Sequence, residues 1–211
     1  MIRIKCCGMT RVEDAVRAAE LGADAIGLIF TARSRRRVDV DQARAIARAL
    51  PPMVTTVALF MDEDPAFVDE VIAAVQPALL QFHGAERDDW CAQFGRPYLK
   101  AIAMGEGADA VPRLRAYPGA AGLVLDGHGL GEAGGSGRAF DWSLMPRDLG
   151  QPLILAGGLH PGNVAEAIRV ARPWGVDVSS GIESAPGIKD PGRLAAFIAA
   201  ARAADGHVQG V

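Results

Sequence analysis

The chain has 211 residues, of which half are hydrophobic and 22% are charged, and its formal net charge is −3. This length and composition suit one large globular domain with a packed core and exclude a disordered chain. The slightly acidic balance argues against a general nucleic-acid-binding protein, because such a protein needs a basic face.

The first ten residues combine a short strand with the start of a helix. Apolar and basic side chains alternate over residues 2–5, which is the period of a strand, and Gly8 ends the pattern. Thr10 with Glu13 matches a capping box, and an apolar stripe follows, so a helix is predicted to begin here. Cys7 therefore stands at the carboxyl end of the first strand, the edge at which α/β proteins keep their chemistry.

Seven further apolar segments are typical of buried strands, and helical patterns separate them. They cover residues 25–30, 54–60, 78–81, 98–102, 122–125, 153–155 and 175–178. The helix of the fifth unit, near 109–116, is interrupted by Pro112, and that of the sixth unit is reduced to 141–145. The last helix is predicted to begin at Pro191, with Asp190 as its cap.

Apolar strands that alternate with amphipathic helices indicate a parallel sheet with helices outside it. Eight such units predict an α/β fold, a closed (β/α)8 TIM barrel with a reduced sixth helix. We expect a single catalytic domain over residues 1–205 and a frayed tail at 206–211. The alternative fold is an open, doubly wound sheet.

Cysteine and histidine usage bears on the compartment and on metals. The three cysteines show no disulfide spacing, which fits a reducing compartment, and the four histidines form no ligand spacing with them. No apolar run approaches the roughly eighteen residues of a membrane span. We therefore expect a cytoplasmic protein with no metal and with no membrane or nucleic-acid partner.

Residues 129–134 match the G-x-G-x-x-G pattern of dinucleotide-binding proteins. More glycines follow in place of a helix, and a segment with six glycines between residues 127 and 137 matches such a pattern easily. We expect no dinucleotide cofactor and interpret residues 127–137 as a mobile loop over the active site.

If the fold is a barrel, its active site lies where the strands end. The residues at those positions that can bind or react are Cys7, Gln81, His83, Asp126, Gly157, Gly158, Ser180 and Gly181. The loops after the seventh and eighth strands of barrels commonly bind phosphate through backbone N–H groups. The glycine-containing pairs after these two strands therefore predict a phosphate site. The alternative is that these glycines only permit tight turns.

The reactive side chains at the strand ends each admit two interpretations. Cys7 is either a small buried residue or a reactive thiol whose pKa is lowered by the helix start. Asp126 ends a buried strand, where a carboxylate is costly unless it is paired or used, and capping the next loop is the alternative to catalysis. His83 is an acid–base group or a structural histidine. An arginine of the run at 33–37 can bind a ligand carboxylate or phosphate, or face solvent.

Seven short segments form one ordered series. They are KCCGMT at 5–10, SRR at 34–36, QFHG at 81–84, LD at 125–126, GGSGRAFDW at 134–142, AGGL at 156–159 and SSGIE at 179–183. In order and in spacing this series resembles the phosphoribosylanthranilate isomerase family of tryptophan biosynthesis. The resemblance extends from residue 3 to about residue 193.

That resemblance implies an aldose–ketose isomerase that needs neither a cofactor nor a metal. Its reaction is the Amadori rearrangement of N-(5-phosphoribosyl)anthranilate to 1-(2-carboxyphenylamino)-1-deoxyribulose 5-phosphate by general acid–base catalysis. Asp126 would be the general acid that opens the ribose ring, and Cys7 the general base that takes the C2′ proton. Arg36 would bind the anthranilate carboxylate. The phosphate would be bound at Gly158, Ser180 and Gly181, beside Gly157, and Gln81 and His83 would line the site.

The partner of such an enzyme is a small phosphosugar, and the sequence is compatible with a monomer or a homodimer. An aminoaldose isomerase of the imidazole pathway would use two aspartates and not Cys7. An indole-forming barrel would need a lysine inside the barrel, for which Lys5 and Lys100 are poor matches. A non-catalytic metabolite-binding barrel is disfavoured because Cys7 and Asp126 are both present. One departure from the family is Gly127, which stands where a hydroxyl residue is usual.

Overall fold

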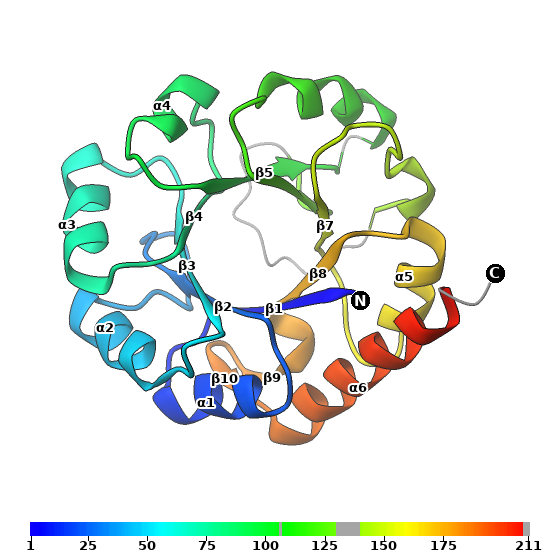
Figure 1. Cartoon of the computed structure of the whole chain (residues 1–211), viewed down its shortest axis with the longest axis horizontal. Coiled ribbons are helices and arrows are strands. Elements are labelled where there is room, and N and C mark those ends of the chain that lie inside the picture. Colours follow the sequence, from blue (N-terminus) through cyan, green and yellow to red (C-terminus); the bar gives the residue numbers. More distant parts are fainter. Residues whose placement is uncertain (106, 130–139, 209–211) are drawn as a thin grey trace.

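Eight parallel strands close into a barrel in the computed structural model, which describes residues 1–105, 107–129 and 140–208 (Figure 1). The strands are β1 Arg3–Cys7, β2 Ala25–Ile29, β3 Thr55–Phe60, β4 Leu79–Phe82, β5 Tyr98–Ala103, β6 Gly122–Asp126, β7 Leu153–Leu155 and β8 Gly175–Val178. They follow one another round the ring, and β1 also pairs with β8, with Ile4 beside Val176. This closure confirms the predicted (β/α)8 barrel and excludes the open, doubly wound sheet.

Helices lie on the outside of the barrel, and one follows each of the eight strands (Figure 1). They are α1 Val12–Glu20, α2 Val40–Ala49, α3 Pro65–Val75, α4 Asp88–Ala92, η1 Gly107–Ala116, η2 Trp142–Leu144, α5 Val164–Ala171 and α6 Pro191–Val208. Pro112 lies inside the 3₁₀ helix η1, and the single 3₁₀ turn η2 confirms the reduced sixth helix. After β8 the chain adds the 3₁₀ turn η3 Ser180–Ile182 and a hairpin of β9 Glu183–Ala185 and β10 Ile188–Lys189. No sequence pattern predicted this hairpin.

The amino ends of α1 and α6 show how far local sequence patterns predict helix caps. Asp190 caps α6 by accepting a hydrogen bond from the backbone N–H of Arg193 at 2.8 Å, as predicted. The predicted capping box of Thr10 and Glu13 is wrong, since no side chain caps α1. Thr10 donates its hydroxyl to the carbonyl oxygen of Gly187 at 2.6 Å instead. A contact with the distant β9–β10 hairpin therefore displaces the local cap.

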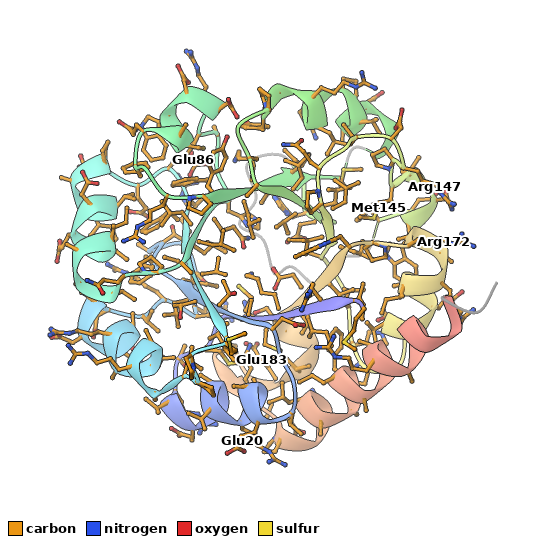
Figure 2. The ribbon with its side chains drawn as sticks, in the orientation of Figure 1. Glu20, Glu86, Met145, Arg147, Arg172 and Glu183 are labelled. Carbon is orange, nitrogen blue, oxygen red and sulfur yellow. The ribbon has the colours of Figure 1, made fainter. Side chains whose placement is uncertain are left out.

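Two apolar layers enclose the strands. Between the barrel and the helices, Phe30, Phe60 and Phe82 stack in a row, with neighbouring ring centroids 5.4 and 6.0 Å apart. Other buried side chains fill this outer layer (Figure 2). Inside the barrel lies a smaller apolar plug of Val57, Leu99, Ala101, Val124, Ile154 and Ala156. Cys7 belongs to a separate small apolar cluster, with Ile29 and Leu59. This cluster lies nearer the carboxyl ends of the strands.

Some sequence-based predictions concern segments at the limits of the described ranges. Within those ranges, no helix is both long and apolar enough to cross a membrane. Helix α6 continues to Val208, into the predicted tail 206–211, and residues 209–211 lie outside the described residues. Most of the predicted mobile loop 127–137, of the G-x-G-x-x-G segment 129–134 and of the motif 134–142 also lies outside them. The mobile loop therefore stays a prediction.

Candidate active site

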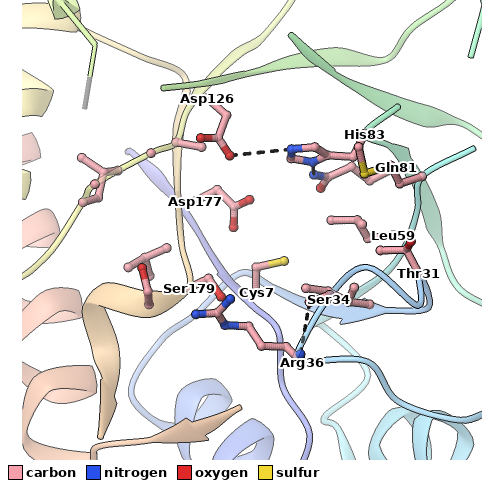
Figure 3. Close-up of a pocket in the computed structure, with 18 residues that line it drawn as sticks. Cys7, Thr31, Ser34, Arg36, Leu59, Gln81, His83, Asp126, Asp177 and Ser179 are labelled. Atoms are coloured by element: carbon pink, nitrogen blue, oxygen red, sulfur yellow. Dashed lines mark hydrogen bonds and ion pairs between the residues drawn. The ribbon is translucent and has the colours of Figure 1, made fainter. Parts of the chain in front are cut away.

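The carboxyl ends of the strands surround a cavity, shown in Figure 3. Eight of the nine predicted site residues line it, namely Cys7, Arg36, Gln81, His83, Asp126, Gly157, Gly158 and Ser180. Gly181 is the exception. The cavity is completed by Ile29, Thr31, Ser34, Leu59, Met61, Ala156, Leu159, Asp177, Val178 and Ser179. Segments from both ends of the chain thus contribute to one site of mixed polar and apolar character.

Cys7 ends β1 and points its thiol into this cavity (Figure 3). Gly27 is its register partner on β2, and a Cβ atom at Gly27 would lie only 2.6 Å from Cys7 Sγ. Cys6 has the opposite side-chain direction and packs in the outer apolar layer. Burial raises the pKa of the Cys7 thiol, and the nearby Lys5 opposes that shift. In the free protein Cys7 is therefore a protonated thiol.

A buried ion pair lies beside this thiol. Lys5 Nζ donates to Asp177 Oδ2 at 2.7 Å, and the two side chains are only 5% and 8% exposed. Lys5 precedes Cys7 by two residues on β1, so both side chains point to the same face. Burial alone lowers the pKa of Lys5, but Asp177 and Cys7 outweigh burial and raise it above its ordinary value. Lys5 is therefore a permanent cation close to the sulfur.

Lys189 of β10 joins the first and last strands of the barrel at the site. Its Nζ donates to the carbonyl oxygens of Cys7 at 2.7 Å and Ser179 at 3.2 Å. It also donates to Glu183 Oε1 at 2.8 Å. Because an ammonium group has three protons, these contacts use all of its donors. Lys189 therefore fixes the backbone at Cys7 and has no donor left for a ligand.

Asp126 ends β6 and faces the cavity from another side than Cys7 (Figure 3). Two histidines flank its carboxylate, with His83 Nε2 at 3.8 Å from Oδ2 and His128 Nδ1 at 3.4 Å from Oδ1. Burial by itself raises the pKa of Asp126, but the contacts with His128 and His83 outweigh it, so that the pKa lies below its ordinary value. Burial lowers the pKa of His83 to about 3, so its ring is neutral. In the free protein Asp126 is therefore an ionised carboxylate.

Arg36 lies at the rim of the cavity and is held by a bidentate ion pair. Its Nε and Nη2 each donate to one carboxylate oxygen of Glu183 at 2.8 Å, and its backbone N–H donates to Ser34 Oγ at 3.1 Å. Hydrogen bonding to Glu183 raises the pKa of Arg36. A guanidinium has five N–H donors, so its other edge can still take a ligand carboxylate. Glu183 is shared with Lys189, so this part of the site keeps an excess of positive charge.

The loops after β7 and β8 meet at the same rim. Gly157 and Gly158 have φ of 84° and 65°, in the left-handed region that favours glycine. Asn163 Nδ2 donates to the carbonyl oxygen of Gly158 at 2.9 Å and ties this loop to the start of α5. A Cβ atom at Gly181 would overlap the carbonyl oxygen of Leu159. Gly181 therefore sets the close approach of the two loops and does not itself line the cavity.

Five polar residues that shape the site were not predicted. Lys5 and Asp177 lie on strands and point inward, so strict strand alternation counted from Cys7 and from the end of β8 could have identified them. Glu183 and Lys189 come from the short β9–β10 hairpin, which carries no periodic apolar pattern. His128 follows the end of β6, and the pairing of β4 with β5 and of β5 with β6 brings its ring within stacking distance of the His83 ring, with centroids 4.7 Å apart.

Comparison with known sequences identifies similar proteins. A family model described as N-(5′-phosphoribosyl)anthranilate (PRA) isomerase matches residues 4–200. The N-(5′-phosphoribosyl)anthranilate isomerase of Pseudomonas aeruginosa is 56% identical over 201 residues, which are 95% of this chain and 95% of that protein. The protein of the same name from Nitrosospira multiformis is 52% identical over 197 residues, which are 93% of this chain and 95% of that protein.

Solved structures show the same similarity. Phosphoribosyl anthranilate isomerase from Thermotoga maritima superposes with a TM-score of 0.87 and 40% identity, covering 96% of this chain and all of that one. A phosphoribosyl anthranilate isomerase in complex with reduced 1-(o-carboxyphenylamino)-1-deoxyribulose 5-phosphate gives a TM-score of 0.84 and 37% identity over 96% of this chain and 100% of that one. Monomers generated from the dimeric Thermotoga maritima protein give 0.82 and 36% over 96% of this chain and 99% of that one.

Proposed function

The chain belongs to the N-(5′-phosphoribosyl)anthranilate isomerase family, and on this premise we propose how its own residues carry out the family's reaction. The protein is an isomerase of tryptophan biosynthesis. It converts N-(5-phosphoribosyl)anthranilate, an aminoaldose, into 1-(2-carboxyphenylamino)-1-deoxyribulose 5-phosphate, an aminoketose. During this change C2′ is oxidised to a ketone while C1′ is reduced, so the enzyme has only protons to move.

The two anionic ends of the substrate fit two parts of the rim. The phosphate accepts hydrogen bonds from backbone N–H groups of the loops at 157–158 and 180–181. The anthranilate carboxylate binds the open edge of the Arg36 guanidinium. Support for this orientation comes from the positions of these groups round the cavity, with Cys7 and Asp126 between them. The sugar carbons that react then lie within reach of both side chains.

Ring opening is the first chemical step that we assign. Protonated Asp126 gives its proton to the ribose ring oxygen, the bond between C1′ and that oxygen breaks, and the nitrogen lone pair forms the Schiff base. The carboxyl group becomes a carboxylate, which the adjacent His83 and His128 stabilise. Support for this role comes from the burial of Asp126, because an isolated buried carboxylate is costly.

Proton abstraction is the second step. The Cys7 thiolate takes the C2′ proton, the electrons of that C–H bond form a double bond between C1′ and C2′, and the electrons of the C1′–nitrogen double bond move to nitrogen. The resulting enolamine tautomerises to the ketone. The Lys5 cation, held by Asp177, stabilises the thiolate. Positioned proton transfer of this kind contributes roughly 10²–10⁴-fold to a rate.

These roles require a thiolate and a protonated carboxyl group, the reverse of the protonation in the free protein. The productive form differs from the major form only in that one proton has moved from Cys7 to Asp126. Both forms carry the same total charge, so their ratio does not depend on pH between the two pKa values. The enzyme therefore works through a minor protonation state of the pair.

The observation that carries this proposal is the placement of Cys7 and Asp126 at one cavity with Arg36 and two glycine loops on its rim. We would generate the substrate in place from anthranilate and phosphoribosyl pyrophosphate with a transferase, and follow loss of its fluorescence. Cys7→Ala and Asp126→Asn should each lower kcat by roughly 10²–10⁴-fold while product affinity is retained. A folded variant with nearly unchanged kcat would remove that residue from its role.

The oligomeric state of this chain is a separate question. A dimeric enzyme from Thermotoga maritima is among the related structures. We expect a monomer or a homodimer, and light scattering of the purified protein distinguishes the two.

A further inference from the structure

Two histidines and Asp126 bring three metal-ligand atoms together at the mouth of the barrel. His83 directly follows β4, and His128 lies two residues beyond β6. His83 Nε2, His128 Nδ1 and a carboxylate oxygen of Asp126 lie within 4.8 Å of one another. All three residues are buried, with at most 8% of their surface exposed. The pairing of β4, β5 and β6 therefore assembles a cluster that the sequence spacing of the histidines does not reveal.

The described residues leave three atoms of this cluster without a hydrogen-bond partner. Among the described residues, His83 Nε2, Asp126 Oδ1 and His128 Nδ1 have no hydrogen-bond partner. The ring-to-carboxylate separations of 3.4 and 3.8 Å are longer than those of good hydrogen bonds. Buried polar atoms normally have a partner, whether protein, water or an ion. The cluster is therefore open to a ligand that accepts electron pairs from all three atoms.

The spacing of the cluster fits a tetrahedral metal ion. Zn²⁺ holds nitrogen and oxygen ligands at roughly 2.0–2.2 Å, which places neighbouring ligand atoms about 3.3 Å apart. His128 Nδ1 lies 3.4 Å from Asp126 Oδ1, which meets this spacing. His83 Nε2 lies 3.8 Å from the other oxygen, Oδ2, so the His83 ring or the carboxylate must rotate to bring the three ligand atoms, now within 4.8 Å of one another, to that spacing. Three protein ligands leave a fourth position. Because His83 and Asp126 line the substrate cavity, that position opens onto it.

Gln81 supplies the outer contact that a ligating histidine needs. Its side-chain amide lies 3.4 Å from His83 Nδ1, and its Oε1 has no partner among the described residues. The two ends of an amide are interchangeable by rotation. With Oε1 turned toward the ring, Gln81 accepts the proton of Nδ1 and leaves the lone pair of Nε2 free for a metal, the arrangement that metal-binding histidines adopt.

We infer that His83, Asp126 and His128 form a binding site for a divalent transition-metal ion such as Zn²⁺, and that the bound ion switches the enzyme off. Two imidazoles and one carboxylate suit Zn²⁺ or Co²⁺ better than Mg²⁺ or Ca²⁺, which prefer oxygen ligands. An ion on the Asp126 carboxylate takes the lone pair that must carry the proton to the ring oxygen. Metal binding follows from the cluster alone, whereas inhibition also rests on the proposed function of Asp126.

The test is calorimetric titration of the full-length protein with ZnCl₂, alongside the fluorescence assay with and without a chelator. We expect a single equivalent of Zn²⁺ to bind, activity to fall with the same affinity, and the chelator to restore it. Loss of an outer contact of a metal site typically weakens metal binding by roughly 10–100-fold. His128→Ala removes a ligand itself, so it should weaken Zn²⁺ binding by at least that factor. His160→Ala removes an exposed histidine outside the cluster and should bind Zn²⁺ as the unaltered protein does.

A second variant guards against misfolding of the first. His83→Gln should also lose Zn²⁺ binding, and circular dichroism checks that both variants are folded. Unchanged Zn²⁺ affinity in folded His128→Ala and His83→Gln, or no binding by the unaltered protein, would overturn the site. Tight binding that is lost in both variants but leaves activity unaffected would support the site and contradict the role of Asp126 as general acid.

Discussion

Gly27 on β2 lies directly beside Cys7 on β1, and the sulfur of Cys7 fills the space that a side chain at Gly27 would take. An added Cβ would lie 2.6 Å from Sγ and 3.1 Å from the Cα of Cys7. Glycine is unfavourable in a strand interior because it loses more conformational freedom than other residues. Its presence here gives the Cys7 thiol a place at the cavity.

Gly27→Ala should therefore displace the thiol while the barrel still forms. A reacting group misplaced by about 1 Å can cost about 100-fold in rate, and we expect a fall in kcat of that order. Product affinity, measured by fluorescence titration, should change little, since the rim of the cavity is untouched. Gly175→Ala adds the same methyl group on β8, at the other end of the barrel, and should leave kcat near normal. Equal losses in both variants would contradict the specific effect on Cys7.

The protonation of Cys7 and Asp126 in the free protein predicts the pH profile of kcat/KM. Burial raises the pKa of Cys7, and the contacts with the two histidines lower that of Asp126 despite its burial. Activity should fall on the acid side as Asp126 becomes protonated while Cys7 keeps its proton. It should fall on the alkaline side as Cys7 ionises after Asp126 has lost its proton. A broad plateau through neutral pH is expected between the two limbs.

Alkylation with iodoacetamide assigns the alkaline limb directly. The rate of modification of Cys7 should rise with pH throughout the plateau and level off only where kcat/KM falls. Cys6 and Cys91 are fully buried, and burial raises the pKa of both to about 12, so these thiols should react much more slowly than Cys7, which lines the cavity. A rate that levels off on the acid side of the plateau would mean that Cys7 is already a thiolate at neutral pH.

Glu183→Gln should weaken substrate binding through Arg36. The neutral amide cannot hold the Nε and Nη2 donors of Arg36 as the carboxylate does. We expect KM to rise about tenfold, equivalent to about 1.4 kcal/mol, with a smaller change in kcat. The rise in KM should disappear with a substrate that lacks the anthranilate carboxylate, since such a substrate offers Arg36 no group to bind. Glu70→Gln on the exposed face of α3 is the matched control and should leave KM unchanged.

Asp24 links the start of β1 to the last helix and should stabilise the fold in a pH-dependent way. Its carboxylate accepts hydrogen bonds from the Ile4 backbone N–H at 2.8 Å, from Arg3 at 3.0 Å and from Arg202 at 2.8 Å. Burial opposes these contacts, but together they lower the pKa of Asp24. A carboxyl group whose pKa is lowered by folding stabilises the protein above its unfolded pKa of about 3.9 and loses this effect as pH falls through the folded value.

Asp24→Asn should accordingly lower the free energy of unfolding by about 1–3 kcal/mol near neutral pH, measured by urea denaturation. The difference from the unaltered protein should shrink as the pH is lowered below the unfolded pKa. Asp69→Asn, at an exposed position of α3, should change the free energy of unfolding by no more than about 0.5 kcal/mol at either pH. A difference between Asp24→Asn and the unaltered protein that does not depend on pH would show that the carboxylate charge is not the stabilising feature.

The sequence predicted the barrel well because its strands and most helices carry strong local patterns. Apolar runs bounded by glycine and proline, such as 153–155, have few other ways to be buried. The capping box at Thr10 failed because its hydroxyl is used by Gly187, a residue 177 positions away. Such a contact depends on how the finished barrel brings distant segments together, and no local pattern reports it.

The site likewise contains residues that local patterns could locate and residues that they could not. Cys7, Asp126 and the glycine loops could be located because strand ends are defined by the apolar runs before them. The groups that set their charge state could not, because Lys5 and Asp177 meet only when β1 pairs with β8. Glu183, the partner of Arg36, could not be predicted either, because it comes from a hairpin without a periodic apolar pattern. The positions of the site residues could therefore be predicted from the sequence, whereas the charges that surround them could be identified only from the fold.

Lys189 has a consequence for how this protein is made. The backbone that carries the Cys7 thiol is anchored by a residue that follows it by 182 positions. Because a ribosome builds the chain from its amino end, Cys7 emerges well before the residue that anchors its backbone. A nascent chain therefore carries the Cys7 thiol through the synthesis of 182 further positions before the anchor exists. A stop codon ahead of β10 should yield an inert polypeptide and not a slower enzyme.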